Sequence, residues 1–278
     1  MTDIISFQGA KGAYSDLACR TVFPDMETLP CKTFEDAFAA VTEGRAKLAM
    51  IPIDNTLAGR VADVHHLLPK AGLHVIGEFF LPIRHALLAV KGATAKDIKY
   101  VMSHIHAIPQ CRAAIKRLGL QPIVHADTAG AAEEISKRGD KEYVAIASTL
   151  AGQIYGLDVL EENIQDADHN TTRFLILSPD PVLLPYVDGQ KVITSLVFRT
   201  RHIPAALYKS LGGFATNGVS LAKLESYVGE GFNVARFYCE AEAHPDSRAM
   251  QLALEELGFY AEEIRVLGTY PAHEFRWQ

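Results

Sequence analysis

Short apolar segments and segments of helical periodicity alternate along the first part of the chain. Apolar runs predict strands, whereas apolar residues spaced three and four positions apart predict helices. Phe34, Phe38 and Val41 have the helical spacing, with Thr33 as the cap and Gly44 as the stop. By these criteria we expect strands at residues 4–7, 48–51, 79–80, 87–90, 100–102, 123–124, 143–146 and 174–177, and helices at residues 15–19, 33–43, 62–68, 107–118, 128–137 and 148–155.

This alternation is typical of an α/β fold whose sheets are rich in parallel strands and covered by helices on both faces. The pattern forms two runs, joined near residues 79–88 and again near residues 158–177. We therefore predict a two-lobed domain over residues 1–178, like that of periplasmic binding proteins. Lobe one would comprise about residues 1–80 and 160–178, lobe two about residues 81–159, with a cleft between them.

A different pattern follows the proline-rich segment at residues 179–185, which is the expected linker. Strands are predicted at residues 192–198, 219–227, 233–240 and 264–269, and helices at residues 204–216 and 246–257. The order β-α-β-β-α-β is that of a ferredoxin-like α+β fold, with Gly229-Glu230-Gly231 as the hairpin turn. We place this second domain at residues 190–272. The fold alone does not specify a function.

Composition excludes several classes of function. The chain of 278 residues has 27 Lys and Arg against 33 Asp and Glu, and its basic residues are scattered, so a nucleic-acid partner is disfavoured. The first residues do not resemble a signal peptide, and no apolar run approaches membrane-spanning length. We expect a soluble, cytoplasmic protein that does not bind membranes.

Neither a metal nor an organic cofactor is indicated. The four cysteines lie far apart, and the close histidine pairs His65-His66 and His104-x-His106 lack the spacing of a familiar metal site. Gly9-x-x-Gly12 lacks the full glycine pattern of a dinucleotide-binding loop. A metal site and a dinucleotide site are therefore disfavoured.

Small polar residues collect where the predicted strands end, which is where ligands bind in open parallel sheets. Ser15, Thr128 and Ser148 are each explained as helix caps. The polar segment at residues 163–173 is harder to explain by packing, because Thr171, Thr172 and Arg173 precede an apolar strand. An Arg flanked by hydroxyl groups in a cleft favours recognition of an anion.

At these residues the chain resembles the prephenate dehydratase family. The resemblance covers roughly residues 1–178, and the Thr172-Arg173-Phe174 element is the family's hallmark. The other matching segments are Gly9-Ala10-Lys11-Gly12-Ala13-Tyr14-Ser15, Ile51-Pro52-Ile53-Asp54-Asn55-Thr56 with Gly59, Ser103-His104 with Gln110-Cys111, Ala145-Ile146-Ala147-Ser148 and Asn163-Ile164-Gln165-Asp166. Asp54-Asn55-Thr56 stands where the family more often has Glu-Asn-Ser.

The resemblance implies a lyase that converts prephenate to phenylpyruvate by decarboxylative dehydration, without a cofactor, in phenylalanine biosynthesis. It implies that Thr172 is catalytic and donates a proton or hydrogen bond to the departing hydroxyl. Arg173 is the first candidate for a substrate carboxylate, with pairing to an acid such as Asp166 as the alternative. Further substrate-binding candidates are Asn55, Thr56, Ser103, Gln110, Asp54, His104, Lys11 and Phe174.

The second domain resembles the ACT regulatory domain usually attached to this family. It implies binding of L-phenylalanine as an allosteric effector by Ala205, Ala206, Leu207, Leu224, Glu225 and Ser226, and assembly as a homodimer or homotetramer. Two positions depart from the family pattern: Ala205 replaces the usual Gly, and Tyr227-Val228 replace the usual Arg-Pro. These changes bear on the strength and sign of phenylalanine regulation.

Three alternatives stay open on sequence alone. Arogenate dehydratase performs the same elimination on a substrate with an amino group in place of the keto group. A two-lobed binding or sensory module would have the same architecture but no use for the Thr-Arg-Phe element. A purely regulatory amino-acid sensor would explain the second domain but not the polar cleft.

Overall fold

The computed structural model describes residues 2–228 and 235–277, which form three sheets. The first sheet has the strand order β2 (Glu27–Cys31), β1 (Ile4–Gln8), β3 (Leu48–Asn55), β11 (Thr171–Ser178) and β5 (His74–Pro82), and the short β4 (Gly59–Arg60) pairs with β3. Strand β1 is parallel to both of its neighbours. The associated helices are α1 (Tyr14–Val22), α2 (Phe34–Thr42), α3 (Ala62–Leu67) and the 3-10 turn η1 (Leu68–Lys70).

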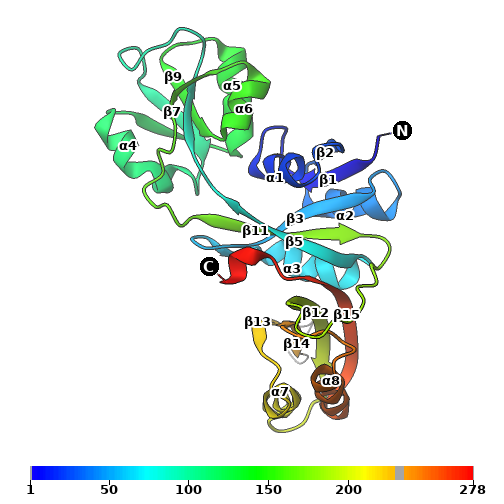
Figure 1. Ribbon diagram of the computed structural model, residues 1–278. Helices are drawn as coiled ribbons and strands as arrows, with labels where there is room; N and C mark the ends of the chain where they lie inside the picture. The colour runs from blue at the N-terminus through cyan, green and yellow to red at the C-terminus, as the bar shows by residue number, and fades with distance from the viewer. Residues whose placement is uncertain (1, 229–234, 278) are drawn as a thin grey trace. The chain divides into compact units, whose positions relative to one another are not determined.

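The second sheet is mixed and has helices on both faces (Figure 1). Its order is β10 (Asp158–Glu161), β6 (Ala86–Ala89), β9 (Tyr143–Ala147), β7 (Tyr100–His104) and β8 (Gln121–His125). Strand β7 is parallel to its neighbours β8 and β9. Strand β6 is antiparallel to its neighbours β9 and β10. Helix α4 (Arg112–Arg117) lies on one face, and α5 (Thr128–Arg138) and α6 (Thr149–Tyr155) lie on the other. The predicted α/β class with parallel-rich sheets is thus confirmed.

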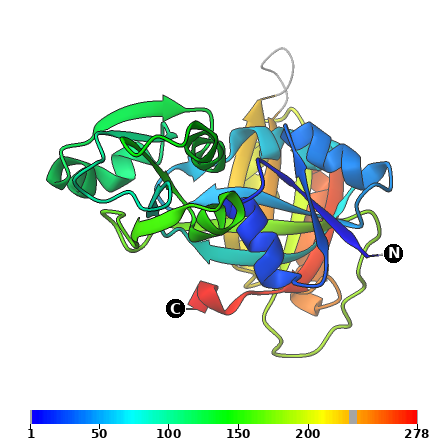
Figure 2. The same cartoon turned by 90° about the horizontal axis from the view of Figure 1, so that it is seen from above.

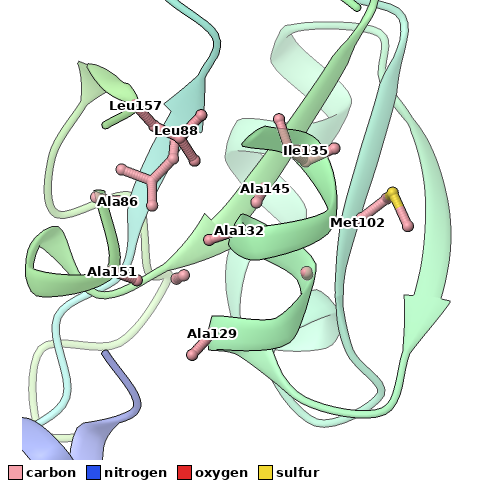
Figure 3. Packing of buried hydrophobic residues seen from close by; sticks show 11 residues of the cluster. Ala86, Leu88, Met102, Ala129, Ala132, Ile135, Ala145, Ala151 and Leu157 are labelled. Atoms are coloured by element: carbon pink, nitrogen blue, oxygen red, sulfur yellow. The ribbon is translucent and has the colours of Figure 1, made fainter. Parts of the chain in front are cut away.

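Alternation along the strands of this sheet produces two separate cores. Leu88 and Ala145 point to one face and pack with Ala132 and Ile135 of α5 (Figure 3). The neighbouring residue Leu87 points to the opposite face, where it belongs to the core that includes α4. Small alanine side chains on α5 and β9 allow the helix to approach the sheet closely.

The third sheet is antiparallel, in the order β13 (Leu221–Val228), β14 (Ala235–Ala241), β12 (Val192–Thr200) and β15 (Ala261–Pro271). Helices α7 (Ala206–Thr216) and α8 (Arg248–Tyr260) share one hydrophobic core with it. The chain order β12-α7-β13-β14-α8-β15 confirms the predicted ferredoxin-like topology. The predicted turn Gly229-Glu230-Gly231 and the first residues of the strand predicted at 233–240 lie outside the described residues.

The chain divides into two compact units. Unit 1 contains residues 1–61 and 79–174, and unit 2 contains residues 62–78 and 175–278. Within unit 1, residues 86–161 carry the second sheet, and residues 4–55 carry β1, β2 and β3 of the first (Figures 1 and 2). Each unit is therefore built from two separate stretches of chain.

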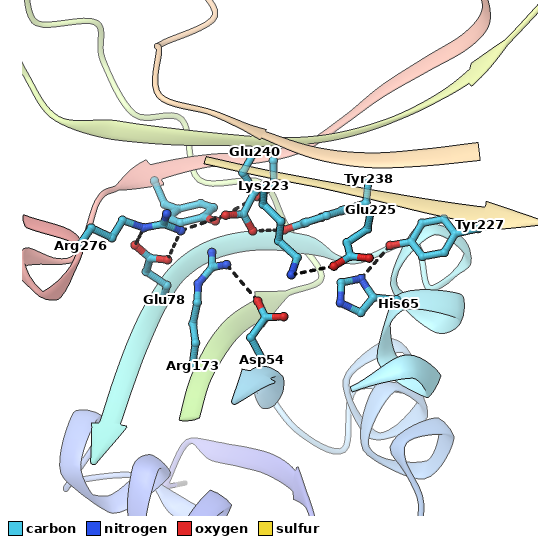
Figure 4. Close-up of polar contacts among 12 residues, drawn as sticks. Asp54, His65, Glu78, Arg173, Lys223, Glu225, Tyr227, Tyr238, Glu240 and Arg276 are labelled. Atoms are coloured by element: carbon cyan, nitrogen blue, oxygen red, sulfur yellow. Dashed lines mark hydrogen bonds and ion pairs between the residues drawn. The ribbon is translucent and has the colours of Figure 1, made fainter. Parts of the chain in front are cut away.

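Charged side chains are buried inside unit 2 (Figure 4). Arg276, in the 3-10 turn η4 (Glu274–Trp277), donates to both carboxylate oxygens of Glu78 at 2.7 and 2.8 Å and to Glu240 at 2.9 Å. Both glutamate side chains are fully buried, and Glu240 also accepts a hydrogen bond from Tyr238. Nearby, a Cβ on Gly268 would lie 1.9 Å from the Val75 carbonyl oxygen, so only glycine allows β15 this approach to β5.

Some local features differ from the sequence prediction. The helix expected at 107–118 is a 3-10 turn, η2 (Ile108–Cys111), followed by the shorter α4, because the Asp166 carboxylate accepts the backbone N–H groups of Arg112 and Ala113. Strands β2 and β10 and the two-residue β4 were not predicted. Strands β2 and β10 are edge strands of their sheets, where only one side is paired and a continuous apolar run is not required.

Candidate active site

A pocket of about 320 Å³ lies within unit 1, among strand ends and helix starts of both of its parts. This size suits a small-molecule ligand. The starts of α1 and α5, the strand β3 with the loop after it, the start of β11, the segment between β5 and β6, and the end of β7 with the loop after it contribute to the pocket. The lining residues are Tyr14, Ser15, Pro52, Asn55, Ala58, Ile83, His85, His104, His106, Ala107, Gln110, Thr128, Asn170, Thr172 and Phe174.

Asn55 controls the orientation of the Thr172 hydroxyl. The Oδ1 atom of Asn55 accepts the backbone N–H groups of Leu57 and Ala58 at 2.9 and 2.8 Å, which leaves its Nδ2 to act as donor. Nδ2 donates to Thr172 Oγ1 at 2.9 Å and to Asn170 Oδ1 at 2.8 Å. Because Thr172 Oγ1 is held as an acceptor, its own proton is available for a ligand in the pocket.

Strand alternation separates the members of the Thr172-Arg173-Phe174 element. Successive side chains of a strand point to opposite faces, so Thr172 and Phe174 line the pocket and Arg173 is directed away from it. Arg173 is buried, and its Nη1 lies 3.6 Å from Asp54 Oδ2. The same alternation in β3 places Asn55 at the pocket and Asp54 on the side of Arg173. The acid paired with Arg173 here is Asp54, whereas Asp166 caps α4.

The caps predicted for two helices were wrong. The N-cap of α1 is Ala13 and that of α5 is Asp127, whose carboxylate accepts Gly130 N–H. Ser15 and Thr128 instead lie in the first turns of these helices and line the pocket. The prediction for Ser148 is confirmed, because its hydroxyl accepts Ala151 N–H at the start of α6. Two helix N-termini with hydroxyl residues therefore face the pocket, an arrangement that favours an anionic ligand.

The loop at residues 9–14 is fastened to α6. The Ser148 hydroxyl donates to the Gly12 carbonyl at 2.6 Å, and the Tyr155 hydroxyl donates to the Lys11 carbonyl at 2.8 Å. Gly12 has φ +86°, and a Cβ there would lie 2.8 Å from Ala151 Cα. This close approach and the positive φ explain why position 12 is glycine. The Lys11 side chain is exposed and is not among the residues lining the pocket.

The remaining predicted site residues differ in position. Gln110, His104 and Phe174 line the pocket with Asn55 and Thr172. Ser103 is fully buried and donates to the Ile146 carbonyl at 2.6 Å, which ties β7 to β9. Thr56 donates to the His169 carbonyl at 2.8 Å. Ser103 and Thr56 thus support the pocket wall, and neither lines the pocket.

Sequence reasoning missed His85 and Asn170 as site residues. His85 follows Pro82-Ile83-Arg84 without a recognisable motif, and Asn170 stands one residue before the Thr-Thr-Arg segment. His85 Nε2 lies 2.9 Å from Gln110 Oε1, and Asn170 Nδ2 donates to the same oxygen at 2.9 Å. The density of amides in residues 163–170 was the one available signal for Asn170.

Burial shifts the titration of the groups in this pocket. It lowers the pKa of His85, opposed by the hydrogen bond to Gln110. It also lowers the pKa of His104, with a further lowering from nearby His106. Burial raises the pKa of Tyr14 well above its usual range. At neutral pH the two imidazoles and the phenol are therefore uncharged, so the donors that these groups offer to a ligand are neutral N–H and O–H groups.

The residues predicted to bind phenylalanine lie in unit 2, three of them at the start of α7 and three on β13. Ala205, the N-cap of α7, has φ 58° and ψ 29°, the left-handed conformation that glycine adopts most readily. Glu225 forms an ion pair with Lys223 at 3.4 Å, and Leu224 is exposed. The departure at Tyr227 has a partner, because its hydroxyl lies 2.7 Å from His65 Nδ1 (Figure 4).

Comparison with known proteins decides the family. The prephenate dehydratase family model matches residues 5–182, the part that holds the pocket. The chain belongs to the prephenate dehydratase family, which is a family of lyases. Among the described residues, no helix has the length and apolar character needed to cross a membrane.

Several relatives resemble the chain along most of its length. It is 50% identical, over 98% of its own length and 97% of the relative's, to the bifunctional N-acyl-homoserine lactone acylase/prephenate dehydratase of Komagataeibacter europaeus. It is 42% identical to arogenate dehydratase/prephenate dehydratase 1, chloroplastic, of Arabidopsis thaliana, over 96% of this chain and 71% of the relative. The prephenate dehydratase of Arthrobacter aurescens, solved in complex with L-Phe, has 29% identity and a TM-score of 0.87, over 97% of this chain and 90% of that one.

Proposed function

We propose that this chain converts prephenate to phenylpyruvate. The observation that carries the proposal is the Thr172 hydroxyl, oriented by Asn55 at the wall of a small pocket in a chain of this family. In the reaction the bond from the ring to the carboxylate breaks, and its electron pair forms the new ring double bond as the C–O bond of the ring hydroxyl breaks. The products are CO₂, water and the aromatic keto acid, and one proton is required for the departing hydroxyl.

Thr172 would supply a hydrogen bond to that hydroxyl. A threonine hydroxyl is a weak acid, so charge developing on Oγ1 needs stabilisation, which the N–H of Asn55 Nδ2 is placed to give. A water molecule in the pocket would replace the proton. Phe174 and Ile83 add apolar surface suited to the ring that becomes aromatic.

The substrate carboxylates have candidate donors in the pocket wall. Ser15 and Thr128 lie in the first turns of α1 and α5, where backbone N–H groups and the helix dipole favour negative charge. Gln110 holds its Oε1 toward Asn170 and His85, which leaves its Nε2 as a donor. Arg173, Asp54, Ser103 and Thr56 would act indirectly, by fixing β3, β7 and β11.

The direct test is to incubate the purified protein with prephenate and no added cofactor and to follow phenylpyruvate by its alkaline absorbance. Arogenate in a parallel reaction, with phenylalanine measured as product, tests the alternative substrate. Turnover of prephenate with the higher kcat/KM supports the proposal. A higher kcat/KM for arogenate would make arogenate the substrate in place of prephenate. Turnover of neither compound would contradict the proposal that this chain is an active lyase.

A second activity is supported by the Komagataeibacter relative, whose name includes an N-acyl-homoserine lactone acylase. Such hydrolysis adds water to an amide carbonyl and breaks its C–N bond, giving a fatty acid and homoserine lactone. The apolar lining at Pro52, Ala58, Ile83 and Ala107 is compatible with an acyl chain. Mass spectrometry of the products from an N-acyl-homoserine lactone tests it, and an unchanged substrate would exclude it.

We also propose that the protein is cytoplasmic, that it forms an oligomer and that L-phenylalanine regulates it. The regulation is supported by the L-Phe complex of the Arthrobacter relative and by the ferredoxin-like sheet of unit 2. Calorimetry with L-phenylalanine should detect binding, and its absence at millimolar concentration would defeat this part. Light scattering that gives a 30.4 kDa monomer would contradict the predicted homodimer or homotetramer.

A further inference from the structure

A continuous series of hydrogen bonds runs through the pocket wall and ends at Thr172. Consecutive contacts measure between 2.7 and 2.9 Å, and the series joins residues from the start of α1, the segment before β6, η2, the residue before β11, β3 and β11. In order, its members are Tyr14, His85, Gln110, Asn170, Asn55 and Thr172.

The backbone fixes the direction of this series. Two backbone N–H groups, from Leu57 and Ala58, require an acceptor at Asn55, so the Asn55 amide can only donate to Asn170 Oδ1. The Nδ2 of Asn170 must then point to Gln110 and donate to its Oε1. An oxygen at that position can only accept. His85 Nε2, 2.9 Å away, must therefore carry a proton.

The other ring nitrogen of His85, Nδ1, lies 2.7 Å from the Tyr14 hydroxyl, which also donates to the Arg84 carbonyl at 2.9 Å. Burial lowers the pKa of His85, so the ring is neutral at pH 7, and with its one proton on Nε2 the Nδ1 atom can only accept. The Tyr14 proton is then shared between Nδ1 and the carbonyl. The His85 imidazole is buried, and it meets the Tyr14 ring edge to face at a centroid distance of 5.5 Å. His85 is thus held as a neutral ring with its proton on Nε2.

We propose that His85 is a positioning residue, whose Nε2–H holds the Gln110 carboxamide so that the Gln110 Nε2 donor faces the substrate. This inference rests on the proposed dehydratase function. The backbone of His85 is fixed independently, because its N–H donates to Gln165 Oε1 and its carbonyl accepts Ile164 N–H. A fixed backbone and a ring held at both nitrogens leave the Gln110 amide one orientation.

Two variants of similar size separate the functions of the two ring nitrogens. His85→Gln can keep an N–H near the Nε2 position, whereas His85→Asn reaches only as far as Nδ1. We expect kcat/KM for prephenate to fall about tenfold in His85→Asn and to stay within about threefold of wild type in His85→Gln. In a Gln110→Leu background, His85→Asn should have no further effect, because the side chain through which it acts is absent.

A purely structural role predicts a different result. His85→Asn would then lower kcat/KM equally with and without Gln110, and His85→Gln would be no better than His85→Asn. Either result would overturn the proposal. Thermal unfolding of each variant identifies any that fail to fold, and the comparison within folded variants decides.

Nitrogen NMR of the histidine rings tests the geometry without activity. We expect His85 at neutral pH to show a protonated Nε2 and an unprotonated Nδ1, and loss of the Tyr14 hydroxyl in Tyr14→Phe should shift the Nδ1 signal. A proton on Nδ1, or a doubly protonated ring, would overturn the inference. If the wild type did not turn over prephenate, the dehydratase proposal would fail, whereas the NMR result would still decide the state of His85.

Discussion

Arg173 Nη1 lies 3.6 Å from Asp54 Oδ2, on the strand faces opposite to those that carry Thr172 and Asn55. Each strand contributes one residue to the pocket and one to the ion pair. Asn55 of β3 and Thr172 of β11 line the pocket, and Asp54 and Arg173 form a partly exposed ion pair between the same two strands. This ion pair helps to fix the strand that carries the Thr172 hydroxyl.

Loss of the Arg173 guanidinium should cost mainly stability. Arg173→Met leaves Asp54, whose side chain is 26% exposed, without this cation, and we expect the free energy of unfolding to fall by about 2 kcal/mol. Urea unfolding measures this, and a cycle with Asp54→Asn should be non-additive. An unchanged stability with a manyfold higher KM for prephenate would show instead that Arg173 binds a substrate carboxylate.

Removal of the Thr172 hydroxyl should cost kcat. Thr172→Ala is expected to lower kcat for prephenate at least about a hundredfold, because the departing hydroxyl loses its donor. Thr172→Ser is the matched control and should stay within about tenfold of wild type, since it keeps Oγ near Asn55 Nδ2. Equal activity of the alanine and serine variants would remove Thr172 from the mechanism.

Asn55→Asp tests the orientation of the same hydroxyl. Aspartate keeps an acceptor for the Leu57 and Ala58 N–H groups but replaces the Nδ2 donor with a second acceptor. Thr172 would then donate to the carboxylate and turn its proton away from the ligand, and we expect kcat to fall about a hundredfold. Unfolding by urea provides the control for stability. Wild-type kcat in this variant would contradict the assigned direction.

The lowered pKa of His85 predicts an effect of pH on stability. Burial lowers this pKa below its ordinary 6.5, so below that pH the unfolded chain takes up a proton before the folded chain does. The free energy of unfolding should therefore fall as pH decreases from about 7 through 6.5 toward the lowered pKa. The side chains that contact the ring nitrogens are Tyr14 at Nδ1 and Gln110 at Nε2.

Urea unfolding at several pH values checks this prediction. His85→Gln has no titrating group at the position and should lose less stability than wild type over the same range. His104, whose pKa is also lowered, contributes the same sign in both proteins. Identical pH dependence in wild type and His85→Gln would show that His85 does not contribute.

Replacement of Ala205 by glycine should stabilise the protein. A residue with a Cβ in the left-handed conformation costs about 1 kcal/mol, part of which is offset by the greater entropy of glycine in the unfolded chain. We expect Ala205→Gly to raise the free energy of unfolding by about 0.5 kcal/mol. Ala206→Gly, in the first helical position of α7, is the control and should not stabilise. Calorimetry on both variants would also measure their affinity for L-phenylalanine.

The sequence predicted the fold well where patterns are strong. Buried strands such as β7 and β9 are continuous apolar runs, and the cap Thr33 has the expected contact with Asp36 N–H. The edge strands β2 and β10 escaped prediction because one side of each is unpaired. The caps at α1 and α5 were misassigned because Ser15 and Thr128 lie one or two residues beyond the capping positions.

The site was predicted only in part, and strand geometry explains why. A linear motif brings Thr172, Arg173 and Phe174 together, but adjacent strand residues point to opposite faces. His85 had no signal in the sequence, because its importance comes from contacts with Tyr14 and Gln110 that are distant along the chain. Such partners become visible only when the fold brings them within hydrogen-bond distance.

The buried Glu78 and Arg276 pair restricts how this protein could be divided in evolution. Its members stand 198 positions apart, and unit 2 is assembled from residues on both sides of the pocket-bearing stretch 79–174. A gene shortened after β11 would produce a chain in which residues 62–78 had lost the rest of their own unit. Residues 62–78 and the C-terminal part of the chain therefore depend on each other for their packing, although the stretch 79–174 separates them in the sequence.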